Sequence, residues 1–405
     1  MNFMIKIILK KNRDESLRRF HPWVFSGAIA QIQGNPAEGD VVAVHASDGS
    51  FLAYGHYQIG SIAVRVLSFD ADVLSPNFWE DMLARALEVR VACGLHNPDA
   101  QGDSVTNCYR LVHGEGDNLP GLIIDYYDGV CVMQAHSAGM FRAKHQIADA
   151  LQKVYGDTLK AVYDKSSGTA PFKAGLDLVD GYLYKRDDFN QDELVVLENG
   201  HKFIVNWTEG QKTGFFLDQR DNRALVGSLA KGRNVLNLFC YTGGFSMYAL
   251  ANGAEHVDSV DSSKKAMMMV DRNVEANGFE PSRHTSLCCD AIEYLRDVPE
   301  GKYDLMIVDP PAFAKHRGAL KNALRAYQRL NAAAISKVAQ GGFVFTYSCS
   351  QVVDKEAFAL AVFSAAAQCG RSVRILDRLN QPCDHSVNIY HPEGEYLKGL
   401  LLYVE

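Results

Sequence analysis

Residues that could bind a ligand or do chemistry follow apolar segments in the second half of the chain, each where a buried strand would end. They are, in chain order, Gly243 and Gly244, Asp261, Asp290, Asp309 and Cys349. In an open sheet of parallel strands, ligands bind beyond the carboxyl ends of the strands. We therefore expect these residues to line one site.

The residues at the first three strand ends, which are the glycine pair, Asp261 and Asp290, indicate a cofactor that contains a nucleoside. Glycines at 243 and 244 let the backbone approach a ligand just before a helix begins, although such a pair could also form only a tight turn. Asp261 could accept both hydroxyls of a ribose, or it could cap the next helix, a role that Ser262 could share. Asp290 could meet the adenine amino group. Because the fingerprint G-x-G-x-x-G is absent, S-adenosylmethionine is favoured over NAD.

The segment "VDPPAF" places Asp309 before two prolines, which fix the backbone and hold a rigid loop. A carboxylate fixed beside the reactive end of the cofactor suits methyl transfer to a nucleic-acid base or another planar, nitrogen-bearing group. Two prolines alone could form a structural turn, but the whole series of strand ends predicts a methyltransferase.

Cys349 lies in "TYSCS", after the apolar run "GGFVF". A free cysteine is usually a small buried apolar residue, but the predicted strand order places this one beside the Asp309 loop. At that place a thiolate could attack the methyl acceptor as a nucleophile. An ordinary thiol, with a pKa of about 8.5, needs local activation, and the sequence does not identify the activating group. The target base must also leave its stack to reach such a site.

Three domains are expected, over residues 1–72, 73–190 and 191–405. Short strands with alternating apolar residues fill the first, and Asp48-Gly49 is a hairpin signal there. A small β-barrel or compact sheet is therefore predicted for residues 1–72, followed by a helix over 76–94 and a polar loop over 95–106.

The middle of the chain, residues 109–189, mixes strands and helix. Three strands are expected up to about residue 137, then one amphipathic helix over 140–156, which ends at Gly156, and then a returning strand. This pattern predicts an α+β domain, and Asn199-Gly200 predicts a hairpin that leads into the last domain.

From about residue 217 strands and helices alternate, which predicts a doubly wound, mostly parallel seven-stranded sheet with helices on both faces. The five parallel strands are "NVLNLFC", "HVDSVD", "HTSLCCD", "YDLMIVD" and "GFVFTYS", and two more are "SVRILDRLN" and "YLKGLLLYVE". Helices are expected to start near Gly244, Ser263, Ala291 and Leu320.

The composition is that of a soluble globular protein, with 47% apolar and 22% charged residues in 405. Nine cysteines without Cys-x-x-Cys pairs indicate neither a disulfide framework nor a metal site, and they favour a cytoplasmic location. No apolar run reaches the ~20 residues of a membrane span, and no signal peptide is expected. The net charge of −7 argues against nonspecific coating of nucleic acid but allows a local basic face.

Seven segments together resemble the bacterial large-subunit (23S) ribosomal RNA cytosine-C5 methyltransferases that carry an N-terminal PUA domain. The segments are "HPWVFSGAI", "GEGDNLPGLIIDYY", "KTGFFLDQR", "NLFCYTGGFS", "VDPPAF", "YSCS" and "EYLKGL", which run from about residue 20 almost to the end. The resemblance implies a PUA domain, a central α+β domain and a class I (Rossmann-like) methyltransferase domain that uses S-adenosylmethionine.

In that family the residue equivalent to Cys349 is the nucleophile, and the aspartate equivalent to Asp309 binds the base. In "KTGFFLDQR", Arg220 suits the cofactor's carboxylate, and Asp218 and Gln219 would close over the cofactor, unless Asp218 only caps a helix. The expected cofactor residues are Asp218, Gln219, Arg220, Asn237, Phe239, Tyr241, Thr242, Gly243, Gly244, Asp261, Ser262, Asp290, Ala291 and Asp309.

One position departs from a second large group of RNA cytosine-C5 methyltransferases, which carry a cysteine directly after the prolines to help release the adduct. Ala312 stands there, so the base that removes the C5 proton is unassigned. Lys315, His316 and water are candidates, while Lys315 and Arg317 could instead be phosphate contacts or solvated charges.

Large-subunit ribosomal RNA is the expected partner, no membrane is expected, and a homodimer is allowed. Basic residues near the N-terminus suit RNA phosphates, although they could equally be a solvated face: Lys6, Lys10, Lys11, Arg13, Arg18 and Arg19. The alternatives to the proposed enzyme are a catalytically idle RNA-binding assembly factor and a methyltransferase that acts on another RNA or a small molecule.

Overall fold

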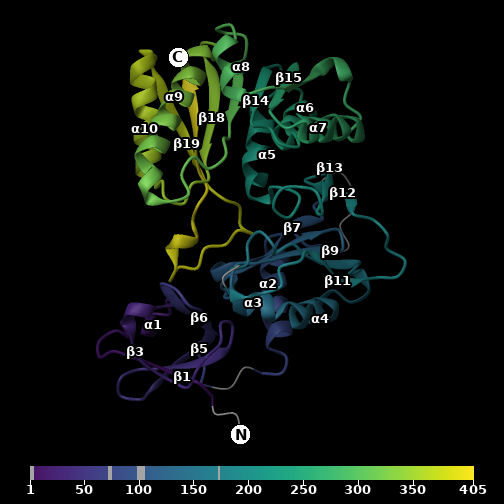
Figure 1. Cartoon of the computed structure of the whole chain (residues 1–405). Coiled ribbons are helices and arrows are strands. Elements are labelled where there is room, and N and C mark those ends of the chain that lie inside the picture. The colour runs from purple at the N-terminus through teal and green to yellow at the C-terminus, as the bar shows by residue number, and fades with distance from the viewer. Residues whose placement is uncertain (1–3, 72–74, 98–104, 172–173) are drawn as a thin grey trace. The chain divides into compact units, whose positions relative to one another are not determined.

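The computed structural model describes residues 4–71, 75–97, 105–171 and 174–405 (Figure 1). The predicted loop over 95–106 therefore falls partly outside the described residues. The chain divides into two compact units. The first comprises Met1–Val196, Val205–Leu217 and Cys383–Gly394, and the second Leu197–Ile204, Asp218–Pro382 and Glu395–Glu405. Among the described residues, no helix is long and apolar enough to cross a membrane.

The first unit begins with a six-stranded sheet in the order β2-β6-β5-β4-β1-β3, accompanied by the short helix α1. Alternate residues of the strands point inward, so that Ile7, Val42, Val44, Val64 and Val66 share one core. The Asp48 carboxylate accepts the backbone N–H of Ser50, which closes the predicted hairpin between β4 and β5. The bounds are β1 Lys6–Leu9, α1 Glu15–Arg18, β2 Trp23–Phe25, β3 Ile29–Gln33, β4 Val41–His45, β5 Phe51–Tyr57 and β6 Ile62–Ser68.

A five-stranded sheet in the order β11-β10-β9-β8-β7 follows, with helices α2, α3 and α4. The three strands and the returning strand that the sequence predicts are present, but edge strand β11 was not predicted. The single helix predicted over 140–156 is two helices, because the chain turns at Ala143 between α3 and α4. The bounds are α2 Phe78–Ala92, β7 Cys108–His113, β8 Leu122–Tyr127, β9 Val130–Ala135, α3 Ala138–Arg142, α4 Lys144–Tyr155, β10 Ala161–Asp164 and β11 Gly181–Lys185.

The hairpin predicted at Asn199-Gly200 joins β12 (Glu193–Glu198) to β13 (His201–Asn206). Asn199 has a φ of 49° and Gly200 a φ of 81°, which are the left-handed values that such a two-residue turn requires.

The second unit is a seven-stranded sheet in the order β16-β15-β14-β17-β18-β20-β19. The first five strands are parallel, and β20 pairs antiparallel with both β18 and β19, which confirms the predicted doubly wound, mostly parallel sheet. The strand bounds are β14 Asn234–Leu238, β15 His256–Asp261, β16 His284–Cys288, β17 Leu305–Val308, β18 Gly342–Ser348, β19 Val373–Leu379 and β20 Lys398–Val404.

Helices cover both faces of this sheet, as Figure 1 shows for α8, α9 and α10 on one side and α5, α6 and α7 on the other. The four predicted helix starts are correct to within one residue, but α5 and α10 were not predicted. The bounds are α5 Arg220–Leu229, α6 Gly244–Ala251, α7 Lys264–Ala276, α8 Ala291–Asp297, α9 Leu320–Lys337 and α10 Lys355–Cys369.

Candidate active site

The sheet order brings the predicted strand ends together. Strands β15, β14, β17 and β18 are consecutive neighbours and parallel, so their carboxyl ends meet at one edge of the sheet. Asp261 ends β15, Asp309 directly follows β17, and Cys349 directly follows β18. The structure therefore places the candidate cofactor residues and the candidate catalytic residues along one continuous edge.

The loop after β14 is tightly wound, because three of its residues have positive φ: Phe239 at 57°, Tyr241 at 49° and Gly243 at 80°. A Cβ on Gly243 would lie 3.1 Å from the side chain of Val270, so glycine suits both the angle and the space. The loop leads directly into α6, which begins at Gly244. Free backbone N–H groups at such a helix start suit a polar or anionic ligand group.

Asp261 holds this loop in place. One carboxylate oxygen accepts the N–H of Tyr241 at 3.0 Å, and the other accepts the N–H of Ser263 at 2.9 Å. The residue that caps α7 is Ser263, whose side chain accepts the N–H of Ala266, so neither Asp261 nor the exposed Ser262 is the cap. A carboxylate fixed at two points keeps lone pairs available for ribose hydroxyls, and this role remains a prediction.

Two buried residues at this loop, Asn237 and Thr242, make hydrogen bonds that help to fix it. Asn237, at the end of β14, is fully buried and donates to the hydroxyl of Ser246 at 2.9 Å. Its Oδ1 has no hydrogen-bond partner in the described part of the chain. Thr242 is also buried, and its carbonyl accepts from Asn273 at 2.9 Å.

Asp290, at the end of the next strand along the edge, caps α8. Its carboxylate accepts the N–H groups of Ile292 at 2.8 Å and Glu293 at 2.9 Å, which places the buried Ala291 at the first helical position. One Asp290 oxygen makes both bonds, so the contact with an adenine amino group remains a prediction for the other.

The "LDQR" segment contributes Asp218 and Gln219 to the edge. Gln219 donates to a carboxylate oxygen of Asp309 at 3.0 Å, and Tyr396 donates to Asp218 at 2.7 Å. The other Asp218 oxygen is buried without a hydrogen-bond partner among the described residues. Helix α5 begins at Arg220 with Gln219 at its N-cap, so Asp218 is not the cap.

Arg220 is buried rather than open to the strand ends. Its guanidinium lies 3.7 Å from the carboxylate of Glu198, which also pairs with Arg223 at 2.7 Å. Its contact with a cofactor carboxylate stays a prediction, while the structure gives it a structural partner.

Asp309 is partly buried, and burial together with the negative charge of Asp218 raises its pKa to about 7, against an ordinary value of 3.8. The hydrogen bond from Gln219 acts in the opposite direction but does not offset this. A carboxyl group with such a pKa can both hold and release a proton at neutral pH.

Cys349 is partly buried too, and burial with the charges of Asp309 and Asp218 raises the pKa of its thiol to about 12. Lys398 acts in the opposite direction. The negative charge of Asp309 therefore reaches the thiol. In the free protein the thiol keeps its proton at neutral pH.

The loop after Cys349 is fixed by residues to which the sequence analysis gave no role. The buried amine of Lys398 donates to the carbonyls of Ser350 and Val353, each at 2.7 Å. The Tyr327 hydroxyl forms hydrogen bonds with the hydroxyls of Ser348 at 2.9 Å and Ser350 at 3.1 Å. Ser350 also accepts the N–H of Ala314 at 3.4 Å, which joins the Cys349 loop to the loop that carries Asp309. The sequence signal that could have revealed this role of Lys398 is a lysine within the mostly apolar segment "EYLKGLLLYV".

The remaining basic candidates lie in the solvent. Lys315, His316 and Arg317 are exposed, and none is assigned as the base that removes the C5 proton. The six N-terminal basic residues are all exposed. Arg18 pairs with Asp14, and Arg19 pairs with Glu15, each four residues earlier in the chain. Lys10 donates to a backbone carbonyl.

The sequence matches two family models. A PUA-like domain matches residues 7–69, and an S-adenosylmethionine-dependent methyltransferase matches residues 185–400. The unpartnered buried oxygens of Asn237 and Asp218, the glycine loop and the Asp261 carboxylate fit a cofactor with a ribose and an amino-acid part.

Several curated proteins are similar over almost their whole length. "Ribosomal RNA large subunit methyltransferase I" of Pseudoalteromonas translucida is 39% identical over 399 residues, and the protein of the same name in Aeromonas salmonicida is 38% identical over 400. In both cases the match covers 98% of each chain.

Solved structures share the fold. A protein of Streptococcus mutans, described as a SAM-dependent methyltransferase, superposes with a TM-score of 0.82 at 23% identity, over 99% of this chain and 100% of that one. A second, solved as a complex with SAH, gives a TM-score of 0.83 at 23% identity with the same coverage.

Proposed function

Because the chain belongs to the family of S-adenosylmethionine-dependent methyltransferases named ribosomal RNA large subunit methyltransferase I, we propose that it forms 5-methylcytosine in large-subunit (23S) ribosomal RNA through a covalent cysteine adduct. The observation that carries this proposal is the pair Cys349 and Asp309 at the ends of neighbouring strands β18 and β17. A thiol next to a carboxyl group that can donate a proton is what addition to a cytosine ring needs.

Asp218, Asn237, Asp261 and the loop at Gly243 would hold the cofactor, and Asp290 would meet its adenine. When bound, S-adenosylmethionine supplies the electrophilic methyl group that C5 accepts. Cys349 and Asp309 are assigned to the addition step and to its reversal.

The first step is addition of the Cys349 sulfur to C6. As the S–C6 bond forms, the ring electrons move toward C5 and N3, and N3 takes a proton. Asp309, with its pKa raised to about 7, can donate that proton. Moving one proton from the Cys349 thiol to Asp309 prepares both groups without changing the net charge of the site. The carboxylate thus gives the thiol, whose pKa is raised to about 12, a proton acceptor within the site.

The last step reverses the addition. A base removes the proton from C5, its electrons restore the C5–C6 double bond, and the C6–S bond breaks to return Cys349 as a thiolate. Asp309 can take back the proton from N3. No side chain is assigned as the C5 base, because Ala312 offers no acid-base group and the nearby Lys315 and His316 are exposed, so water is the favoured acceptor.

RNA that carries 5-fluorocytidine tests the covalent step, because fluorine cannot leave C5 as a proton does. We expect the wild-type protein to form an adduct with such ribosomal RNA that survives denaturation, and the peptide that carries it to contain Cys349. Cys349→Ala should lose both the adduct and turnover while keeping cofactor affinity. Cys93→Ala, at an exposed cysteine of the first unit, is the matched control and should behave as wild type.

Two outcomes would contradict the proposal. Normal methylation by Cys349→Ala excludes the covalent mechanism, and a methyl group found on another atom of the RNA excludes the C5 product. An adduct mapped to Cys240 would move the nucleophile, although burial and the charge of Asp261 raise the pKa of that thiol well above its ordinary value. Comparing 5-methylcytosine in ribosomal RNA with and without the gene identifies the nucleotide.

A further inference from the structure

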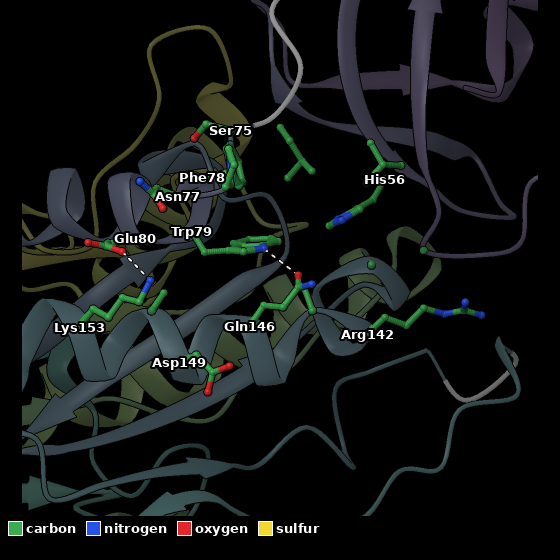
Figure 2. Close-up of a pocket in the computed structure, with 17 residues that line it drawn as sticks. His56, Ser75, Asn77, Phe78, Trp79, Glu80, Arg142, Gln146, Asp149 and Lys153 are labelled. Atoms are coloured by element: carbon green, nitrogen blue, oxygen red, sulfur yellow. Dashed lines mark hydrogen bonds and ion pairs between the residues drawn. The ribbon is translucent and has the colours of Figure 1, made fainter. Parts of the chain in front are cut away.

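The first unit contains a pocket of about 610 Å³, and all the residues that line it belong to that unit (Figure 2). Its walls come from β4 and β5 of the six-stranded sheet, from the start of α2, and from α3 and α4. This volume falls within the range of sites that hold small molecules or single nucleotides, roughly 300–1,000 Å³. No residue of the proposed reaction lines it.

Trp79 forms one wall of the pocket with its indole ring. The indole N–H donates to the side-chain oxygen of Gln146 at 3.1 Å, which fixes the orientation of the ring. The imidazole of His56 is nearly parallel to it, with an interplanar angle of 25° and centroids 6.3 Å apart. Figure 2 shows both rings close to edge-on, with His56 pointing toward Trp79. The partly exposed Trp79 ring, held flat against this neighbour, offers a face on which a planar ligand can stack.

His56 is a buried polar side chain with one ring nitrogen that has no hydrogen-bond partner among the described residues. Only 4% of the residue is exposed, and its Nδ1 has no partner among the described residues. Gly139 makes room for the ring, since a Cβ there would lie 2.1 Å from it. Burial lowers the pKa of His56 to about 4, so the ring is neutral at physiological pH and suits an uncharged aromatic partner.

Polar groups at the pocket wall match the edge and the phosphate of a nucleotide. Gln146, Asp149 and Lys153 project from one face of α4, with spacings of three and four residues. Because the Gln146 oxygen is engaged by Trp79, its NH₂ group remains as a donor, and Asp149 supplies acceptors. Lys153 is paired with Glu80 at 3.1 Å, whereas the guanidinium of the exposed Arg142 is 4.0 Å from its nearest carboxylate, Asp40.

We propose that this pocket binds one unstacked nucleotide of the substrate RNA, with its base on the Trp79 ring, its edge against Gln146 and Asp149, and its phosphate at Arg142. The proposal rests on the proposed function only in taking RNA as the substrate. It assigns a second contact to that RNA, away from the base that is methylated. Aromatic stacking combined with a cationic side chain is how proteins hold single-stranded RNA.

Fluorescence anisotropy with a labelled single-stranded oligoribonucleotide tests the contact in the full-length protein. Trp79→Ala should weaken binding about 5- to 150-fold, the range for losing one base-stacking ring, without changing the dependence of affinity on salt. Arg142→Ala should weaken binding and reduce the slope of log affinity against log salt by about 1, because one phosphate contact is lost. Val89→Ala, at an exposed apolar residue on the same helix as Trp79, is the control and should bind as wild type.

A second measurement decides the matter even if Trp79→Ala does not fold. The chain has three tryptophans, so the oligoribonucleotide should quench the fluorescence of the wild type but much less that of Trp79→Phe. Unchanged RNA affinity in both Trp79→Ala and Gln146→Ala, or equal quenching in Trp79→Phe, would overturn the proposal. Saturation by free nucleoside monophosphates at lower concentration than by RNA would also overturn it, in favour of a free-nucleotide site.

The proposed methylation and the proposed pocket fail separately. S-adenosylmethionine affinity should be the same in wild type, Trp79→Ala and Arg142→Ala, since the pocket lies outside the methyltransferase edge. Loss of the fluorocytidine adduct with retained quenching of Trp79 would refute the chemistry alone, and the reverse result would refute the pocket alone.

Discussion

At the scale of single residues, the active-site edge concentrates negative charge. The charge of Asp218 adds to burial in raising the pKa of Asp309, and the charges of Asp309 and Asp218 add to burial in raising the pKa of the Cys349 thiol, while the charge of Lys398 lowers it. The charged form of Asp309 therefore carries an energetic cost in the folded protein, to which burial contributes most.

This energy predicts a pH-dependent difference in stability between wild type and Asp309→Asn. The pKa of Asp309 rises from 3.8 in the unfolded chain to about 7 in the fold, so the folded protein binds the proton more tightly. The stabilisation is fully present below about pH 4 and is lost as the pH rises through 7. The variant should therefore gain stability relative to wild type between pH 4 and pH 8, by at most about 4 kcal/mol.

Urea unfolding at several pH values measures that gain in stability. Asp297→Asn, on an exposed side chain at the end of α8, controls for the loss of one negative charge. A constant difference between Asp309→Asn and wild type across this pH range would mean that Asp309 is an ordinary surface carboxylate.

At the scale of elements, two loops must hold their shape, one to position Cys349 for the base and one to position the cofactor. The Cys349 loop depends on the buried Lys398 amine, and the loop after β14 depends on backbone angles that suit glycine. Each dependence can be tested by one substitution.

Lys398→Met removes the amine but keeps most of the side-chain volume. Two buried carbonyls lose their donor, so the protein should lose about 1–3 kcal/mol of stability. Because Cys349 would be held less exactly, kcat should fall about 10- to 100-fold while S-adenosylmethionine affinity changes little. Lys355→Met, which breaks only an exposed pair with Glu395, should leave kcat unchanged. Equal kcat values for the two variants would show that Lys398 is dispensable for the loop.

Gly243→Ala places a side chain at a φ of 80° and 3.1 Å from Val270. The left-handed angle alone costs about 1–2 kcal/mol. Gly278→Ala pays a similar cost at a φ of 69°, but nothing lies within 4 Å of its Cβ. We expect both variants to lose stability in chemical unfolding, and only Gly243→Ala to lose about tenfold in cofactor affinity by calorimetry. An equal loss of affinity in both would remove the loop from the cofactor site.

Much of this edge could be predicted from the sequence because each parallel strand is a short apolar run that ends at a polar residue. The run before Asp309 and the run before Cys349 are examples, and their order along the chain fixes their order in the sheet. Helix α10 could not be found in the same way, because its apolar residues surround it: Phe358 and Val362 are buried while Leu360 and Phe363 are exposed. A helix without one apolar face has no periodic signal.

Contacts between distant parts of the chain gave no local signal. Lys398 lies next to Ser348 across two antiparallel strands, and Tyr327 reaches the same loop from α9. Their spacing along the chain carries no pattern, since only the sheet order brings them together. The edge strand β11, Gly181–Lys185, has no buried residue and so lacks the alternation that marks a strand.

At the scale of the whole molecule, the two units are not consecutive pieces of the chain. Residues Cys383–Gly394 lie between β19 and β20 of the second unit but belong to the first. There the Asp384 carboxylate accepts the N–H of Arg110 at 2.9 Å, and its carbonyl accepts from the buried Arg90 at 2.8 Å. A Cβ on Gly116 would lie 2.0 Å from the carbonyl oxygen of Ser386, and the rings of His391 and Trp23 are 4.3 Å apart. The segment is thus built into the first unit.

Asp384→Ala should therefore destabilise the first unit although its position in the sequence is within the methyltransferase part. Loss of a buried carboxylate that accepts the Arg110 N–H should cost about 1–3 kcal/mol. Hydrogen exchange should show faster exchange in β7, at Cys108–His113, while β14 of the second unit is unaffected. Glu393→Ala, at an exposed side chain of the same segment, should leave exchange in β7 unchanged. Slow exchange in β7 of Asp384→Ala would mean that the segment Cys383–Gly394 contacts the first unit without stabilising it.

The order in which a ribosome makes this chain adds a consequence. Translation adds residues at about 5–20 per second from the N-terminus, and the first unit has almost all its residues by position 217. The first unit nevertheless stays incomplete until Cys383–Gly394 are made, and these are among the last residues to emerge. Until then the surfaces that Asp384, Ser386 and His391 will cover are open to chaperones and proteases. A message cut short near its end would thus yield a protein defective in its first-made part as well as its last.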